Sequence, residues 1–290
     1  HDRNKGRLGV PGDGIAESNS PAAATQAVVT EGNEFNLSFP TTTEFVELPS
    51  RGKYYPEGHP LKDVEEVEIK QMTAKDEDIL TNRDYIRRGV AIDMMLKNLL
   101  VDKTIQLDLL LSGDKSAILL AARRSGFSPY YEAKITCPSC TTPSPLEFDL
   151  SLCESDHGYD ESVHMEVSYT ENNTFVFALP YGDIKVEARL LTSLDEREIF
   201  KRLSVRKKKV ENNVTESLKR IIVSVNDNAT PEAISFFVEN CPSILLRSFR
   251  ENYKKIIPSV IMSQVFVCPH CAHEEEVEPP IGVDFLYPQP

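Results

Sequence analysis

The sequence predicts an α+β fold in which helical segments and an antiparallel β-meander are clamped by a split ribbon built from two cysteine knuckles. Two C-P-x-C pairs lie far apart in the chain, at residues 137–140 and 268–271. Between them, three runs of alternating apolar and polar residues are separated by short polar turns. Other stretches place apolar residues at the spacing of helices that face a core.

The first 40 residues are predicted to form an extended arm. They are rich in Gly, Asn, Ser, Ala and Pro and contain few large apolar residues, so they cannot bury a core of their own. We expect residues 1–40 to lie along a neighbouring chain, with folding back onto their own subunit as the alternative.

Residues 41–128 are predicted to form a strand, loop and helix region. A loop rich in Gly and Pro follows the first strand. One helix begins at the N-cap Thr73 and carries Ile86 on its apolar face. The third helix is opened by Ser112 or Asp114 and stopped by Gly126. The other expected segments are strands at 45–49 and 64–70 and helices at 92–100 and 114–124.

The meander is expected in residues 151–192 and a helical region in residues 193–263. In the helical region, Ser193 and Glu196 form a capping box. The basic run 206–209 is expected to end that helix as a solvated C-terminus. Residues 216–225 fit either a helix or a strand, and Thr230 and Pro242 open the later helices. The expected meander strands are 163–169, 175–179 and 184–190.

Residues 129–150 and 264–288 are predicted to form a split zinc ribbon, because each cysteine pair lies between two β-like segments. A C-x-x-C turn places two thiolates on one side of a tight loop, and two such loops supply the four sulfurs that structural zinc prefers. A full shell of four sulfurs leaves no open position for a catalytic water. The expected ligands of one structural Zn²⁺ are Cys137, Cys140, Cys268 and Cys271.

The alternatives for these cysteines are disulfides, a redox pair, or free thiols. His270 or His273 would have to replace a sulfur for a Cys3His site, although four sulfurs are already available. Cys153 and Cys241 stand alone and are expected to be buried, unreactive thiols.

Charge and motif content argue against several classes of function. The formal net charge of −13 argues against nucleic-acid binding. No stretch reaches the roughly 18 to 20 apolar residues of a membrane helix, and the start of the chain does not resemble a secretory signal. We therefore expect a soluble protein without membrane insertion. The sequence has no nucleophile elbow, phosphate-binding glycine loop or H-E-x-x-H motif, so no enzymatic activity is predicted.

Several blocks of the sequence resemble, in order, a known family. They look like the baseplate hub subunit and hub assembly proteins of contractile-tailed bacteriophages of the T-even type. The resemblance runs from about residue 41 to residue 288. Its blocks are 45–56, 72–80, 89–93, 113–119 with 121–123, the two cysteine pairs, 273–277 and 284–288.

This resemblance implies a structural, non-enzymatic component of a phage tail baseplate, at or near the hub. It implies contacts with other tail and baseplate proteins, multiple copies in a symmetric assembly, and a location in the host cytoplasm during assembly and then in the virion. A transient assembly factor absent from the mature virion is the first alternative. A zinc-ribbon module that binds nucleic acid is the second.

The candidate contact surfaces with these partners are the loop at 54–55, the N-terminal arm and the C-terminal segment 285–287, because aromatic residues on irregular segments often anchor interfaces. The alternative for each is packing in the local core. The candidates are Tyr54, Tyr55, Phe285, Leu286 and Tyr287.

The sequence departs from the family pattern at both knuckles. Family members usually carry Gly after the second cysteine, where this chain has Thr141 and Ala272. A side chain with a Cβ disfavours the positive φ that Gly adopts, so these knuckles are expected to be strained or differently turned. The chain also has no Trp, and Tyr287 stands where the family often has one.

Overall fold

The computed structural model describes residues 27–28, 41–164, 166–180, 183–205 and 213–286. The predicted arm lies outside these ranges, apart from Ala27 and Val28. The basic run 206–209 and Tyr287 also lie outside them. All strand pairings among the described residues are antiparallel and occur beside helices, which confirms the α+β prediction.

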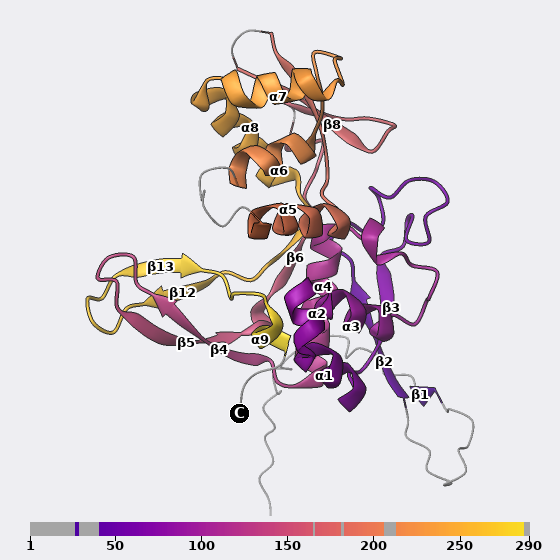
Figure 1. The fold of residues 1–290 in the computed structure, drawn as a ribbon, viewed down its shortest axis with the longest axis vertical. Helices are drawn as coiled ribbons and strands as arrows, with labels where there is room; N and C mark the ends of the chain where they lie inside the picture. The colour runs from indigo at the N-terminus through magenta and orange to yellow at the C-terminus, as the bar shows by residue number, and fades with distance from the viewer. Residues whose placement is uncertain (1–26, 29–40, 165, 181–182, 206–212, 287–290) are drawn as a thin grey trace, which may run out of the picture.

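The N-terminal part pairs a hairpin with a group of helices (Figure 1). Strand β2 (Thr41–Glu47) pairs with β3 (Glu66–Lys70), and β1 (Ala27–Val28) pairs with the start of β2. The predicted strands at 45–49 and 64–70 are therefore present, with shifted ends. The helices of this part are α1 (Ala74–Thr81), α2 (Arg83–Arg88), α3 (Ala91–Leu99), the 3-10 turn η1 (Leu107–Leu109) and α4 (Ser112–Gly126).

The first predicted helix is interrupted at Asn82, so the prediction that it continues through Ile86 is wrong. Asn82 has extended backbone angles and ends α1. Its side-chain oxygen then accepts hydrogen bonds from the backbone N–H groups of Asp84 and Tyr85, which starts α2. A short polar side chain that caps the next turn favours a new helix over continuation.

A four-stranded sheet with the order β10-β9-β8-β7 contains the predicted meander. The first strand begins at Val167 and not at Val163, because Asp160 accepts hydrogen bonds from Ser162 and the backbone of Val163 in a turn. Residues 216–225 contain both alternatives in succession, since helix α6 (Asn213–Ile221) is followed directly by strand β10. The strands are β7 (Val167–Tyr169), β8 (Thr174–Ala178), β9 (Lys185–Arg189) and β10 (Ile222–Val225).

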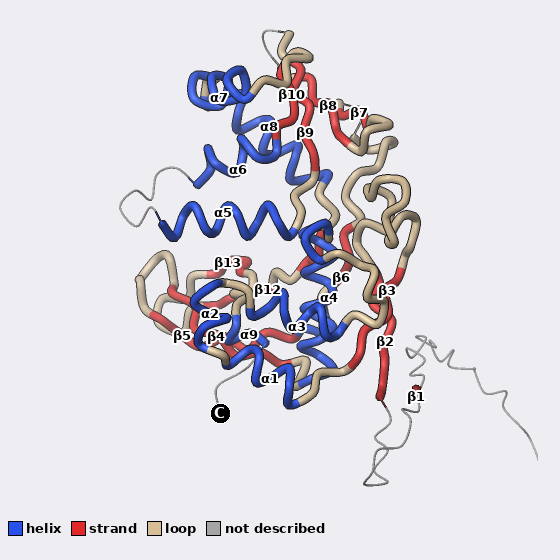
Figure 2. The backbone as a smooth tube through the Cα atoms, turned by 45° about the vertical axis from the view of Figure 1, so that its right-hand side comes forward, coloured by secondary structure: helices blue, strands red, loops and turns tan. Residues whose placement is uncertain are grey.

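Four helices accompany this sheet (Figure 2). Thr230 caps α7 and Pro242 precedes α8, as the sequence predicts. The capping box of α5 lies one residue earlier than predicted: Asp195 accepts from the N–H and hydroxyl of Thr192, whereas Ser193 donates to the Leu110 carbonyl. The helices are α5 (Ser193–Val205), α6 (Asn213–Ile221), α7 (Pro231–Asn240) and α8 (Ser243–Ile256).

Two hairpins carry the cysteine pairs and project from the helical part (Figure 1). A short pairing of β6 with β11 and the 3-10 turn η2 (Leu150–Leu152) connect them to the body, and α9 (Val283–Leu286) packs near α4. The strands are β4 (Tyr130–Thr136), β5 (Pro143–Asp149), β6 (Glu154–Asp156), β11 (Ser259–Ile261), β12 (Gln264–Val267) and β13 (Glu274–Val277).

A close backbone approach joins distant parts of the chain at the start of α4. A Cβ on Gly113 would lie 2.0 Å from the carbonyl oxygen of Pro258. Only a residue without a side chain fits there, which explains a glycine in the first turn of a helix.

Four of the five candidate contact residues lie in the core of this chain, and the fifth, Tyr287, lies outside the described residues. Tyr54 and Tyr55 are 6% and 1% exposed, and Phe285 and Leu286 are fully buried. At these four side chains the structure favours the alternative of local packing over an exposed anchor for a partner. The edge-to-face contact of Phe285 with Tyr131, at 5.0 Å between ring centroids, shows the packing directly.

The lengths of the described helices also bear on membrane association. Among the residues that the structure describes, no helix combines the length and the apolarity needed to cross a bilayer.

Candidate metal centre and a tyrosine-lined cavity

The two cysteine knuckles share one backbone geometry. In the first, the N–H of Thr141 donates to the carbonyl of Cys137, and the N–H of Cys137 donates to the carbonyl of Thr142. In the second, the N–H of Ala272 donates to the carbonyl of Cys268, and the N–H of Cys268 donates to the carbonyl of His273. Each turn therefore presents its two sulfurs from one side of a closed loop.

The fold brings the four sulfurs of these knuckles together. All four lie within 4.8 Å of one another. The sulfur of Cys137 is 3.7 Å from that of Cys271, and the sulfur of Cys140 is 3.6 Å from that of Cys268. The close contacts thus cross between the knuckles, which joins the hairpin β4–β5 to the hairpin β12–β13.

These separations fit a tetrahedral metal site. Four sulfurs at about 2.3 Å from a zinc ion, at tetrahedral angles, lie about 3.8 Å from one another. A disulfide would need two sulfurs about 2.05 Å apart. All six cysteines are free thiols in the structure. The donor set therefore fits zinc in type, number and spacing.

The site has a buried side and an open side. Cys137 and Cys268 are buried with Phe266 in a small apolar cluster that is separate from the main core. Cys140 is partly buried and Cys271 is exposed. An ion held here would bridge the hairpins where apolar burial alone is small.

Both knuckles place a side chain in the left-handed backbone region. Thr141 has a φ of 59° and Ala272 a φ of 56°. Of the two alternatives that the sequence left open, the structure therefore shows the strained one. This left-handed conformation costs each residue roughly 1 kcal/mol relative to glycine, which adopts it freely.

The crowded thiols titrate unequally. Hydrogen bonds from Thr142 lower the pKa of the Cys140 thiol to about 6. The His273 N–H lowers the pKa of Cys271, but desolvation and hydrogen bonds with the other three sulfurs outweigh it and raise that pKa to about 11. A bound cation would favour the thiolate form of all four, so metal binding would release protons.

The nearby histidines lie apart from the sulfur cluster. The ligand-type atoms that gather around one point, among the described residues, are the four cysteine sulfurs. The imidazole of His273 lies 3.9 Å from the carboxylate of Glu275, and His270 is exposed.

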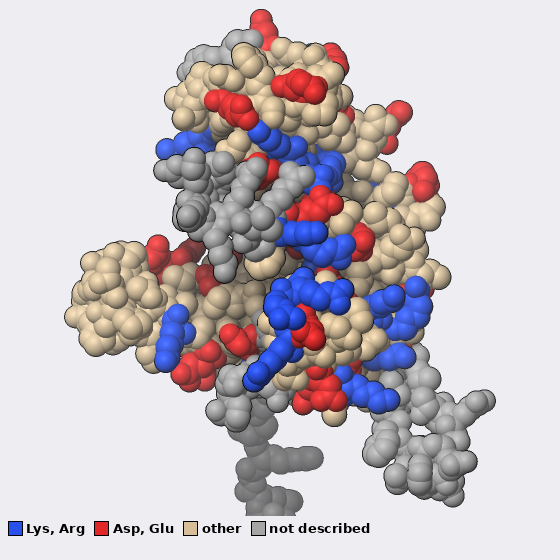
Figure 3. Space-filling view, in the orientation of Figure 1, with Lys and Arg blue, Asp and Glu red and all other residues tan. Residues whose placement is uncertain are grey.

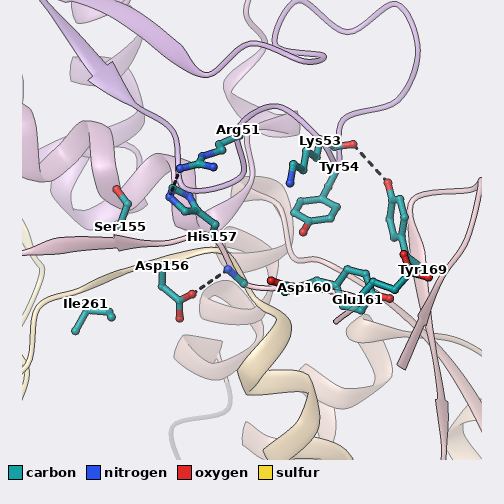
Figure 4. A pocket seen from close by; sticks show the side chains of 12 residues that line it. Arg51, Lys53, Tyr54, Ser155, Asp156, His157, Asp160, Glu161, Tyr169 and Ile261 are labelled. Carbon is teal, nitrogen blue, oxygen red and sulfur yellow. Dashed lines mark hydrogen bonds between the residues drawn. The ribbon is translucent and has the colours of Figure 1, made fainter. Parts of the chain in front are cut away.

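A second feature is an open cavity of about 730 Å³ between the loop at 51–54, the segment 155–161 and Tyr169 (Figure 4). The hydroxyl of the buried Tyr54 points into it. Burial raises the pKa of Tyr54 to about 12, so this hydroxyl stays protonated at neutral pH and can donate a hydrogen bond.

The cavity contains Ser155, Asp156 and His157, but not in a catalytic arrangement. The Nδ1 of His157 lies 3.0 Å from the carbonyl oxygen of Pro49 and therefore carries the proton. Its Nε2 then accepts a hydrogen bond from Arg51 at 2.7 Å. Asp156 accepts from the backbone of Gly158. Since both ring nitrogens are engaged, the imidazole is not poised to take a proton from Ser155.

The aromatic cluster beside this cavity is not predicted from the sequence. The ring of Tyr54 lies 5.5 Å from that of Tyr169 and 5.5 Å from that of Phe175. Tyr169 ends the predicted strand 163–169 and Phe175 begins the predicted strand 175–179, so the sequence indicated that these two aromatic residues lie close together. The sequence does not show which aromatic from the distant loop completes the cluster.

One comparison with known proteins returned a match. A family model described as "T4 bacteriophage base plate protein" matches residues 41–286. The match covers the helical parts, the four-stranded sheet and both cysteine hairpins. Searches of curated proteins and of solved structures each returned no match.

Proposed function

The chain belongs to the T4 bacteriophage base plate protein family, and from this premise we propose that it is a structural subunit at or near the hub of a contractile tail. The family places it in the tail baseplate of a virion, in contact with other tail or baseplate proteins. The single observation that carries the proposal is the family match across the described fold.

A structural zinc ion is the second part of the proposal. Cys137, Cys140, Cys268 and Cys271 would hold it, and their cross-knuckle spacing of 3.6 to 3.7 Å supports this. Zinc with four sulfur ligands would supply fold stability and no open position for chemistry. The ion would join the start and the end of the segment 141–267, and so make the split ribbon one unit.

A non-enzymatic role is the third part of the proposal, and the geometry of the two sites supports it. The sulfur cluster would be saturated by its protein ligands, and the histidine in the cavity is engaged by Arg51 and Pro49. The described residues of the cavity offer hydrogen-bond donors, aromatic surface and mixed charges, which suit recognition of a protein segment.

The test is quantitative mass spectrometry of purified mature particles and isolated tails, with the tail tube protein as the internal standard. A hub subunit is expected at a small, fixed number of copies per tail. Absence from particles, together with abundance in infected-cell lysate, would overturn the structural role and identify a transient assembly factor.

A gel-shift experiment with DNA and RNA at low salt addresses the remaining alternative. The structural role predicts no shift, because a chain of net charge −13 repels phosphates. A salt-dependent shift would favour the nucleic-acid module.

A further inference from the structure

One side-chain amide joins the two cysteine hairpins at the ends that lie farthest from the knuckles. The Nε2 of Gln264 donates a hydrogen bond of 2.7 Å to the carbonyl oxygen of Asp149, and its Oε1 accepts one of 3.0 Å from the N–H of Asp149. Gln264 is the first residue of β12, which leads to the knuckle at 268–271. Asp149 is the last residue of β5, which leads away from the knuckle at 137–140. The amide therefore links the bases of the two hairpins.

These two hydrogen bonds take the place of a strand pairing. β5 and β12 belong to separate two-stranded sheets, and no backbone pairing of the described strands joins them. The backbone of Asp149 has one donor and one acceptor, and the Gln264 amide satisfies both. Because both hydrogen bonds are partly buried, their loss would leave backbone groups that water reaches poorly. The amide thus holds the two hairpins together at their bases.

The inner face of β12 continues from this amide to the metal centre. Side chains at alternate positions of a strand point to one face, so Gln264 and Phe266 share a face and Cys268 follows at the same spacing. Phe266 and Cys268 are each 1% exposed, whereas the two intervening valines are more than half exposed. Ile135 and Leu146 of the other hairpin pack against the cluster of Phe266 and the buried sulfurs. The contact between the hairpins therefore consists of the amide at the base, an aromatic ring in the middle and the sulfurs at the tip.

Apolar burial contributes little to the closure of the tip. In Figure 3, which has the orientation of Figure 1, the hairpins form a lobe that protrudes from the body at the left. The buried apolar cluster in this lobe consists of Phe266 and two cysteines. So few buried side chains supply only a small part of the free energy that brings the knuckles together. Other contacts between the hairpins therefore affect how often the four sulfurs are gathered.

We propose that Gln264 is a positioning residue of the metal centre. Its amide holds the hairpin bases together, so that the four knuckle sulfurs are already gathered when a zinc ion binds. This inference rests on the zinc part of the proposed function and adds to it a residue outside the ligand set. A site that is closed in only a fraction of the molecules binds with an apparent Kd raised by the inverse of that fraction. Loss of the amide is expected to raise the apparent Kd for zinc about tenfold, the combined effect of two partly buried hydrogen bonds.

Competition with the coloured zinc chelator 4-(2-pyridylazo)resorcinol tests this role in the full, zinc-loaded chain. The absorbance of the chelator gives both the apparent Kd for zinc and the rate of zinc release. Gln264→Asn shortens the amide by one carbon, so that it no longer reaches both backbone groups of Asp149. Gln264→Glu keeps the length but replaces the donor by an oxygen, which the Asp149 carbonyl repels. Each variant is expected to raise the Kd and the release rate about tenfold.

Matched substitutions separate this role from a general loss of stability. Gln106→Asn and Gln106→Glu make the same chemical changes at an exposed residue whose side chain does not cap η1. Tyr55→Phe removes buried hydrogen bonds with Leu111 and Asp114 in the body and leaves both hairpins unchanged. All three controls are expected to bind and release zinc like the wild type. Circular dichroism at the assay temperature checks that each variant is folded.

The outcomes distinguish the positioning role from the zinc assignment itself. Wild-type affinity and release in both Gln264 variants would overturn the positioning role and leave the zinc site in place. Equal acceleration of release by Tyr55→Phe would show that Gln264 acts only through overall stability, which would also overturn the role. A folded Gln264 variant that retains no zinc would support it, as the extreme of the expected loss. A wild-type chain that binds no zinc would refute the zinc assignment, and the positioning role with it.

Discussion

The hydroxyl of Tyr55 donates a 2.7 Å hydrogen bond to the carboxylate of Asp114, at the start of α4. Both residues are buried, and the same hydroxyl accepts from the backbone N–H of Leu111 at 3.1 Å. Asp114 also accepts from the N–H and the hydroxyl of Ser50. These hydrogen bonds thus link the glycine- and proline-rich loop to α4, which also contacts β2 and β11.

Replacing Tyr55 by Phe tests the contribution of these hydrogen bonds to stability. We expect Tyr55→Phe to lower the free energy of unfolding by about 1 to 3 kcal/mol, because the buried Leu111 N–H loses its acceptor and Asp114 loses a donor. Chemical denaturation measures the change. Tyr130→Phe is the control, since Tyr130 is 53% exposed. Equal stability of Tyr55→Phe and Tyr130→Phe would show that the hydrogen bonds of the Tyr55 hydroxyl do not stabilise the fold.

Metal content tests the sulfur cluster. We expect the purified chain to carry about one zinc ion, and each serine substitution at Cys137, Cys140, Cys268 or Cys271 to reduce bound zinc and the unfolding temperature. Elemental analysis by mass spectrometry measures the ratio of metal to protein.

Two other cysteines provide the matched control. Cys153→Ser and Cys241→Ser also remove a partly buried thiol but lie outside the cluster, so zinc content should not change. Intact-mass measurement that found disulfides among the four clustered cysteines, with no metal, would show that the zinc assignment is wrong.

The knuckle strain predicts stabilising substitutions. Thr141→Gly and Ala272→Gly are each expected to raise the free energy of unfolding by roughly 0.5 to 1 kcal/mol, because relief of the left-handed penalty exceeds the added entropy of the unfolded chain. Ala178→Gly, in an exposed position of β8, should lower it. If all three substitutions destabilise the zinc-loaded protein to the same degree, the knuckle backbone is not strained.

The pair of Asp195 with Arg189 predicts an acid dependence of stability. Burial alone would raise the pKa of Asp195, but hydrogen bonds from Arg189 at 2.7 and 2.8 Å and from Thr192 hold that pKa below its usual value. A carboxyl with a lowered pKa in the folded state stabilises the protein above its unfolded pKa of about 3.9 and loses this contribution as the pH falls through the folded value.

Asp195→Asn should therefore cost about 3 kcal/mol at neutral pH, because Arg189 and Arg220 lose their shared counter-charge. The difference from the wild type should shrink below about pH 4. Urea denaturation across a pH series measures it, with the exposed Asp78→Asn as the control. A difference that stays constant from neutral to acid pH would exclude this pair as its source.

Local signals in the sequence predicted several helix boundaries well. Thr73, Thr230 and Pro242 precede helices in the structure because capping involves only neighbouring residues. The start of α5 shows where local signals are insufficient. Thr192 with Asp195 and Ser193 with Glu196 both fit a capping box, and the choice between them depends on the distant partners Leu110 and Arg189.

The tyrosines of the loop show the same limit. Tyr54 and Tyr55 lie on an irregular segment, and from the sequence they fitted an exposed contact as well as a core position. Asp114 and Phe175, which are far away in the chain, decide that both are buried. Burial depends on which segments fold against each other, and residue type alone does not specify this.

The sequence by itself determined that this chain has two knuckles with zinc-type ligands, because a C-P-x-C turn needs only its own backbone to set two sulfurs side by side. It also carried the pattern of the phage baseplate family. Only the tertiary structure decided that the sulfurs of the two knuckles meet and that Tyr54 and Tyr55 are buried. These properties depend on contacts between residues far apart in the chain, which the folded core sets.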